Sequence, residues 1–151
     1  MADPRPPEQR KSDTLEALAA HEADVWTATA GREGQPHLVP LSLCWLDERI
    51  VLVTEPTTST VRNLRAGSTA RLGLGPTRDV VMIDAVLESD HDSTEVTPEI
   101  ADAFAAQSGW DPRQATGDFR YVVLRPVRVQ AWREETELAD RTLMRDGEWL
   151  V

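Results

Sequence analysis

The fold of this chain is decided by residues 36–54, which read PHLVPLSLCWLDERIVLVT. Two apolar runs rich in strand-forming residues are separated here by the polar pair Asp47-Glu48, so a tight turn joins them. A connection this short pairs two strands antiparallel, because parallel strands need a long crossover. Pro40 has no N–H donor, which predicts that the first strand is bent, bulged or at an edge there. The stretch therefore predicts an antiparallel pair at the heart of the fold.

Working outward, further strand-like runs lie on both sides of this pair. Strand follows strand with short turns, an order that favours an antiparallel β-barrel over a βαβ sheet. Pro126 marks a bend in the last and longest run. The sequence thus predicts a mainly β protein, a β-barrel with peripheral helices. The expected strands are residues 25–30, 37–46, 49–54, 70–74, 80–87 and 119–133.

Three helices are expected around these strands. Asp13 with Glu16 resembles a capping box and predicts a first helix over residues 12–23. Ser59 is placed to cap a short helix that ends at Gly67, and Pro98 fits the first turn of a third helix that ends near residue 109. A short polar helix is expected after residue 134. Residues 1–11 are polar and rich in proline, which predicts a disordered leader before a single domain over residues 12–151.

Composition excludes several classes of function. The 151 residues carry a formal net charge of -10, which argues against a general nucleic-acid role because phosphate neutralisation needs a basic face. No apolar run reaches the length of a membrane span, and the N-terminus lacks the apolar segment of a secretory signal, so we expect a cytoplasmic protein. Cys44 is the single cysteine and the three histidines are scattered, so we expect a buried inert thiol and no metal site.

One polar turn has the chemistry of an anion site. Residues 58–67 read TSTVRNLRAG and follow directly after the strand that ends at Thr54. Free N–H groups at the start of a helix, with hydroxyls and a guanidinium beside them, bind phosphate well. The same residues also fit a second interpretation, a polar turn with a serine cap and solvated arginines. The residues that would supply the cradle are Thr54, Thr57, Thr58, Ser59, Thr60 and Arg62.

Four segments in this order resemble a known family. They are residues 36–54, residues 58–67, residues 75–85 (GPTRDVVMIDA) and residues 119–133 (FRYVVLRPVRVQAWR). From about residue 15 onward the chain resembles the pyridoxamine 5'-phosphate oxidase-like proteins, which include flavin- and deazaflavin-dependent oxidoreductases. The resemblance implies a six-stranded antiparallel split barrel of the FMN-binding type. It also implies a homodimer with the cofactor ring in a groove at the subunit interface.

The resemblance suggests which residues contact the cofactor. The strand containing Val39, Pro40 and Leu41 matches the one that lies against the flavin ring in relatives, although Leu41 also fits a core position. Asn63 is either a pocket contact or an amide on the helix surface, and Trp132 and Trp149 are expected at the groove or the dimer interface. The full expected set is Val39, Pro40, Leu41, Thr54, Thr58, Ser59, Thr60, Arg62, Asn63 and Arg78.

One position departs from the family pattern and bears on the choice of cofactor. Many relatives have a basic residue where this chain has Thr60, so Arg62 or Arg78 must supply the positive charge for a phosphate. FMN and the deazaflavin F420 are the two expected cofactors. The arginine-rich composition favours F420, because its acidic tail suits an arginine-lined groove.

The resemblance implies an oxidoreductase that transfers a hydride between F420 or FMN and a small organic substrate. The cofactor performs that chemistry, so we assign no catalytic side chain. The alternative is a non-catalytic protein that stores or shields a flavin, a deazaflavin or haem. Oxidation of pyridoxamine phosphate itself is disfavoured, because the chain is short and lacks a basic motif for the substrate phosphate.

Overall fold

The hairpin at residues 36–54 forms as the sequence predicts. In the computed structural model, which describes residues 2–151, strands β2 (Pro36–Leu46) and β3 (Arg49–Thr54) pair antiparallel, from Leu46↔Arg49 to Leu43↔Leu52. Asp47 and Glu48 form the turn with φ angles of 49° and 59°. Both residues therefore adopt the left-handed conformation that a two-residue hairpin with the right twist requires.

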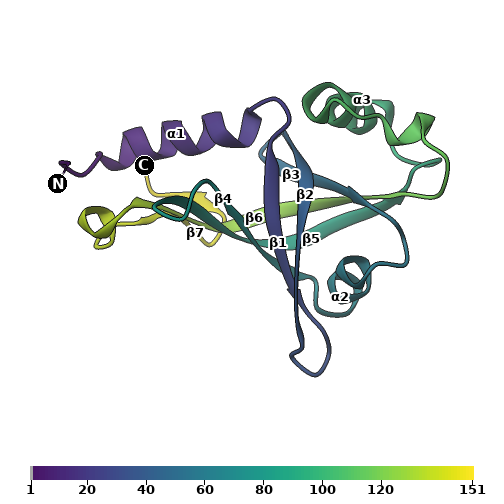
Figure 1. The fold of residues 1–151 in the computed structure, drawn as a ribbon, viewed down its shortest axis with the longest axis horizontal. Coiled ribbons are helices and arrows are strands. Elements are labelled where there is room, and N and C mark those ends of the chain that lie inside the picture. Colours follow the sequence, from purple (N-terminus) through teal and green to yellow (C-terminus); the bar gives the residue numbers. More distant parts are fainter. Residues whose placement is uncertain (1) are drawn as a thin grey trace.

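Six strands close into an antiparallel barrel (Figure 1). Their order is β3-β2-β1-β4-β5-β6, and a pairing between β3 and β6 completes the circle. Two short strands, β7 and β8, continue the sheet beyond β6 and were not expected from the sequence. The predicted six-stranded antiparallel barrel is confirmed. The remaining strands are β1 (Asp24–Ala30), β4 (Thr69–Leu74), β5 (Asp79–Asp92), β6 (Arg120–Arg133), β7 (Thr142–Arg145) and β8 (Glu148–Trp149).

The barrel is split because two of its strands change partners along their length. The first part of β6, residues 120–124, pairs with β3, whereas Val129 and Gln130 pair with β7. Pro126 lies between these two parts, opposite Ala85, at a shift in the β5–β6 register. The predicted bend at Pro126 is therefore confirmed. Over Pro36–Ser42, β2 pairs with β1 alone, so Pro40 lies in an edge segment as one of the sequence interpretations required.

Apolar side chains fill the barrel, and a second apolar cluster lies under helix α3 (Pro98–Ser108). That second cluster includes Cys44, Phe104 and Tyr121. Cys44 is 1% exposed, so it is buried as predicted, and this burial raises the pKa of its thiol to about 11. The largest apolar side chains that are fully buried inside the barrel are Leu43, Ile50, Leu52, Leu72, Ile83 and Leu124.

The first helix differs from its prediction. Helix α1 runs over Pro7–Ala19, with Pro6 at the cap position, so residues 7–11 are helical and not part of a disordered leader. Asp13 lies within the helix and does not cap it; its carboxylate accepts hydrogen bonds from Gln9 and Arg5. The helix starts early because Pro7 is preset for a first helical turn and because Arg5 fastens the segment before it.

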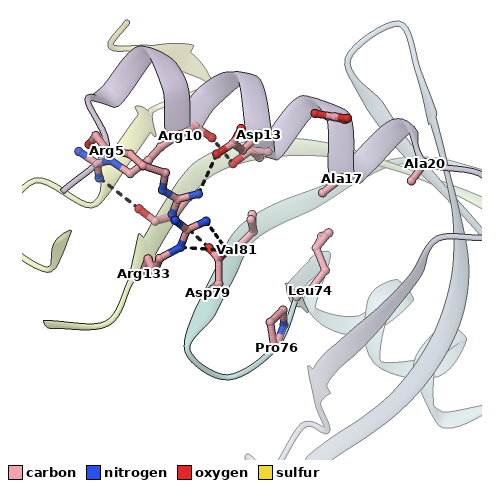
Figure 2. Close-up of a pocket in the computed structure, with 14 residues that line it drawn as sticks. Arg5, Arg10, Asp13, Ala17, Ala20, Leu74, Pro76, Asp79, Val81 and Arg133 are labelled. Atoms are coloured by element: carbon pink, nitrogen blue, oxygen red, sulfur yellow. Dashed lines mark hydrogen bonds and ion pairs between the residues drawn. The ribbon is translucent and has the colours of Figure 1, made fainter. Parts of the chain in front are cut away.

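Arg5 joins the N-terminal segment to three other parts of the molecule, and two of its partners, Asp13 and Asp79, are drawn in Figure 2. Its guanidinium donates to Asp13 at 2.8 Å, to Asp79 at the start of β5 at 3.1 Å, and to Glu137 at 2.8 Å. Glu137 also accepts from the backbone N–H groups of Arg5 and Arg133, and its side chain is 1% exposed. These bonds lower the pKa of Glu137 from 4.5 to about 2, chiefly through the Arg5 side chain.

The remaining elements follow the prediction with shifted ends. Helix α2 covers Ser59–Gly67, and its cap is Thr58, one residue before the expected Ser59. Strand β5 continues to Asp92, five residues beyond its predicted end, because its last residues pair with the start of β6, as in His91↔Tyr121. Two short 3₁₀ helices, η1 (Pro112–Gln114) and η2 (Glu135–Glu137), complete the chain, and η2 corresponds to the polar helix expected after residue 134.

Candidate functional site

The polar turn after β3 and the first turn of α2 form the centre of the candidate site. The Thr58 hydroxyl caps α2 by accepting the N–H of Val61 at 3.4 Å, and it lies 3.5 Å from the hydroxyl of Thr54 at the end of β3. The first N–H groups of a helix have no partner within the helix, and the helix dipole makes this end positive. Thr54, Thr58 and Ser59 therefore surround the positive end of α2, as predicted.

Arg62 adds a full positive charge at the same end of the helix. Its guanidinium folds back and donates to the carbonyl of Thr57 at 2.8 Å and to the Ser59 hydroxyl at 2.9 Å. Both partners are uncharged, and within the described residues Arg62 forms no ion pair. The charge of Arg62 is thus fixed in position and available to an anion.

Thr60 and Asn63 connect α2 to the barrel. Thr60 is 1% exposed, so it faces the barrel and packs there. The Asn63 amide donates to the hydroxyl of Thr29 on β1 at 3.1 Å. Asn63 also lines a cavity beside α2, so both interpretations of this residue hold in part: it is an anchor that borders a pocket.

That cavity is basic. Its volume is about 410 Å³, and arginines supply most of its lining. Arg65 pairs with Asp90 at 2.8 Å, but Arg62 has no carboxylate partner and Arg32 contributes a third guanidinium from the turn between β1 and β2. In a chain with a net charge of -10, such a concentration of arginine favours an anionic ligand. The lining residues are Arg32, Arg62, Asn63, Arg65 and Ala66.

The three expected residues of β2 do not share one face. Successive residues of a strand point to opposite sides, and the register places Val39 opposite buried Thr27 and Leu41 opposite buried Val25. Val39 and Leu41 therefore face the barrel side, and Leu41 packs against the core, as its alternative interpretation held. Pro40 is exposed and lies opposite Trp26 on the outer side.

Arg78 lies away from α2. It follows β4 in the turn before β5, whereas α2 precedes β4, so the whole length of β4 separates them (Figure 1). Six strand residues span roughly 20 Å. The Arg78 side chain is 84% exposed, and its nearest carboxylate is Glu134 at 3.7 Å. Within one copy of the chain, Arg62 lies at the start of α2 and Arg78 does not.

An apolar groove of about 520 Å³ lies on the outer face of the barrel, over β1, β2, β4, β5 and β6. Trp26 is 53% exposed and Leu38 is 59% exposed, and both line this groove. Trp132 also lines it, whereas Trp149 lies elsewhere, under Lys11 at 4.8 Å and bonded to Glu48. Trp26 and Leu38 were not singled out from the sequence. The pattern that could have identified them is a large apolar residue at a position of β1 or β2 whose side chain faces outward, where a polar residue is usual.

A further cavity, of about 450 Å³, lies between α1 and the β4–β5 turn (Figure 2). Its charged wall consists mainly of groups that already pair with one another, Arg5 with Asp13 and Asp79, and Arg133 with Asp79. The paired charges make this cavity a weaker candidate for an ionic ligand than the arginine pocket beside α2.

Residues 2–151 contain neither a cluster of metal ligands nor a membrane-spanning helix. No group of three or more histidine, cysteine, aspartate or glutamate side chains is arranged to hold a metal ion. Among the helices of the same residues, none is long and apolar enough to cross a bilayer. The described residues combine a split barrel, hydroxyl groups with Arg62 at the start of α2 and an apolar outer groove, and these features define the chain as a small split-barrel protein.

Comparison with known proteins places the chain within that class. The family model for pyridoxamine 5'-phosphate oxidase matches residues 12–133, so the chain belongs to this family. No curated protein sequence matches the chain.

Solved structures share the fold at low sequence identity. A structure described as an F420 reductase is 16% identical with a TM-score of 0.61, over 76% of this chain and 94% of that one. A haem-binding protein from Mycobacterium smegmatis is 21% identical with a TM-score of 0.63, over 95% and 59%. An FMN-binding protein from Nostoc punctiforme is 13% identical with a TM-score of 0.54, over 90% and 83%. Identities this low establish the fold alone.

Proposed function

We propose that this protein binds FMN or F420 and transfers a hydride between that cofactor and a small organic substrate. The observation that carries the proposal is the start of α2, where Arg62 keeps an uncompensated charge beside the helix N-terminus and the hydroxyls of Thr54, Thr58 and Ser59. A phosphate group fits these donors. Membership of the family, and likeness to an F420 reductase and an FMN-binding protein, support the choice of cofactor.

The residues have distinct tasks in this proposal. The cradle would hold the phosphate of the cofactor, while the backbone of the strand segment that contains Val39, Pro40 and Leu41 would lie along the ring. When bound, the cofactor supplies the hydride transfer, so the chain itself needs only to position it and exclude water. The guanidiniums of the pocket beside α2 favour F420 over FMN, because they suit a cofactor with an acidic tail.

A homodimer is part of the proposal. The outer groove exposes Trp26 and Leu38 next to Met82 and Trp132, an apolar surface of the kind that a second copy covers. Replacement of Leu38 with Asp should shift the sedimenting species from two copies to one. Leu150→Asp, which changes a leucine that is 50% exposed outside the groove, is the matched control. A monomeric wild-type protein would contradict this part of the proposal.

The proposal also includes a cytoplasmic location. The main test of the proposed cofactor binding is calorimetric titration of the wild-type protein with FMN and with F420. Arg62→Ala should weaken binding of the preferred cofactor by 1.5–3 kcal/mol, about 10- to 150-fold, because a charged hydrogen bond to phosphate is lost. Arg145→Ala, at an exposed position on β7, is the control. Unchanged affinity in a folded Arg62→Ala variant would remove Arg62 from the site.

The alternative function is storage or shielding of a flavin, a deazaflavin or haem without turnover. The likeness to a haem-binding protein favours it, because that structure has the same barrel. The two functions differ in one measurement, the reoxidation of bound reduced cofactor by a panel of organic acceptors. Oxidation that depends on the acceptor supports the enzyme, whereas tight binding with no oxidation supports storage.

A further inference from the structure

The turn between β1 and β2 brings a third arginine to the pocket beside α2. The turn is tight, with the Gly31 N–H donating to the carbonyl of Gln35 and the Gly34 N–H to that of Gly31, each at 2.9 Å. Gly34 has a φ of +79°, which suits glycine. The Asn63–Thr29 bond fastens this end of β1 to α2. Arg32 is therefore presented to the pocket by a well-defined turn.

The charges around this pocket do not balance. Asp90 accepts from Arg65 and also from Arg120, each at 2.8 Å, so one carboxylate serves two guanidiniums. Within the described residues, neither Arg32 nor Arg62 pairs with a carboxylate. Glu33, next to Arg32 in the sequence, does not line the cavity. Two positive charges are consequently left for a ligand.

These two charges reach the pocket from different elements, Arg62 from α2 and Arg32 from the turn between β1 and β2. Arg62 is held over the start of α2 by Thr57 and Ser59. The second part of the pocket is lined by Arg65 and Ala66, about one helical turn beyond Arg62, and Arg32 lines the same cavity from the neighbouring β1–β2 turn. One phosphate held at the start of α2 leaves this second part of the pocket unfilled.

We infer that Arg32 is a specificity-determining residue, which makes the pocket beside α2 select ligands that carry a second anionic group beyond the first phosphate. The inference rests on the proposed function, since it concerns the same site. The ligand class is a phosphate ester extended by a further phosphate or carboxylate. A ligand with a single phosphate uses Arg62 and gains little from Arg32.

The test compares the affinities of the wild type, Arg32→Ala and Arg32→Lys for anions of different length. Arg128→Ala, at an exposed position of β6, is the control. The readout is the affinity for inorganic pyrophosphate and for inorganic phosphate, measured by calorimetry at low salt. Arg32→Ala should weaken pyrophosphate binding about tenfold and phosphate binding less than twofold, the loss expected for one charged contact. Arg32→Lys should recover part of the pyrophosphate affinity.

The same variants are then titrated with FMN and F420. Arg32→Ala should weaken F420 about tenfold and leave FMN within twofold. Any of three results would overturn the inference. Arg32→Ala could lose affinity equally for the long and short anions, it could lose affinity for neither, or the wild type could fail to bind pyrophosphate. If pyrophosphate binding depends on Arg32 but the wild type binds neither cofactor, the proposed function fails and the anion selectivity stands.

Discussion

The carboxylate of Glu137 provides the sharpest test of how the N-terminal segment is held. One of its oxygens accepts from the backbone N–H and Nε of Arg5, and the other accepts from Nη2 of Arg5 and the N–H of Arg133. Glu137→Gln removes the charge and, in either orientation of the amide, points an NH₂ group at two donors. Because both oxygens are occupied, the amide has no favourable orientation.

The size of the effect follows from the pKa. The pKa of Glu137 falls from 4.5 to about 2 on folding. A difference of one in pKa is worth about 1.4 kcal/mol, so the charged carboxylate stabilises the fold by about 3 kcal/mol. A lowered pKa means that this stability is present above about pH 4.5 and is lost as the pH falls toward 2. We therefore expect Glu137→Gln to cost about 3 kcal/mol at pH 7 and progressively less between pH 5 and pH 3.

Urea unfolding followed by tryptophan fluorescence measures this difference at pH 7, 5, 4 and 3. Glu135→Gln is the matched control, because Glu135 is an exposed residue of the same 3₁₀ helix, and it should change the free energy of unfolding by less than about 0.5 kcal/mol. The reasoning is wrong if the Glu137→Gln difference is below about 1 kcal/mol at pH 7, or if it is the same size at pH 7 and pH 3.

Substitutions at three further positions test other local features by the same unfolding measurement. Thr58→Ala removes the cap of α2 and should cost about 1 kcal/mol, whereas Thr58→Ser should cost little. Gly75→Ala should cost at least about 1 kcal/mol, because φ is +85° and a Cβ there would lie 2.4 Å from the Asp79 carbonyl oxygen; a neutral result would contradict that geometry. Thr27→Val should stabilise the protein by about 1 kcal/mol, because the buried Thr27 hydroxyl has no hydrogen-bond partner, and destabilisation would show that the hydroxyl is satisfied.

Local sequence patterns predicted those parts of the fold whose causes are local. The β2–β3 hairpin follows from two apolar runs and the turn at Asp47-Glu48, and α2 follows from its cap and its terminal glycine. The start of α1 was missed because its fastening residue, Arg5, binds Glu137, which lies 132 positions away in the sequence. A contact at such a separation leaves no periodic signal in either segment.

In the candidate site, too, the sequence predicted the local contacts and missed the long-range ones. Thr54, Thr58, Ser59 and Arg62 come together because they are close in the sequence and share one turn. Arg78 was grouped with them on family resemblance, yet the length of β4 keeps it at the other end of the strand. The contribution of Arg32 depends on the packing of the β1–β2 turn against α2, which only the folded structure shows.

The place where β6 changes partner has a consequence for behaviour at high concentration. A split barrel leaves two strand edges, and an exposed edge is a template on which neighbouring molecules pair into fibres or irregular aggregates. One of these edges, in β2, contains Pro36 and Pro40, which offer no N–H to an incoming strand. The other is finished by β8, which is just two residues long and too short to template a partner. The two edges at the opening of the barrel are thereby protected against edge-to-edge pairing, so the split does not promote aggregation.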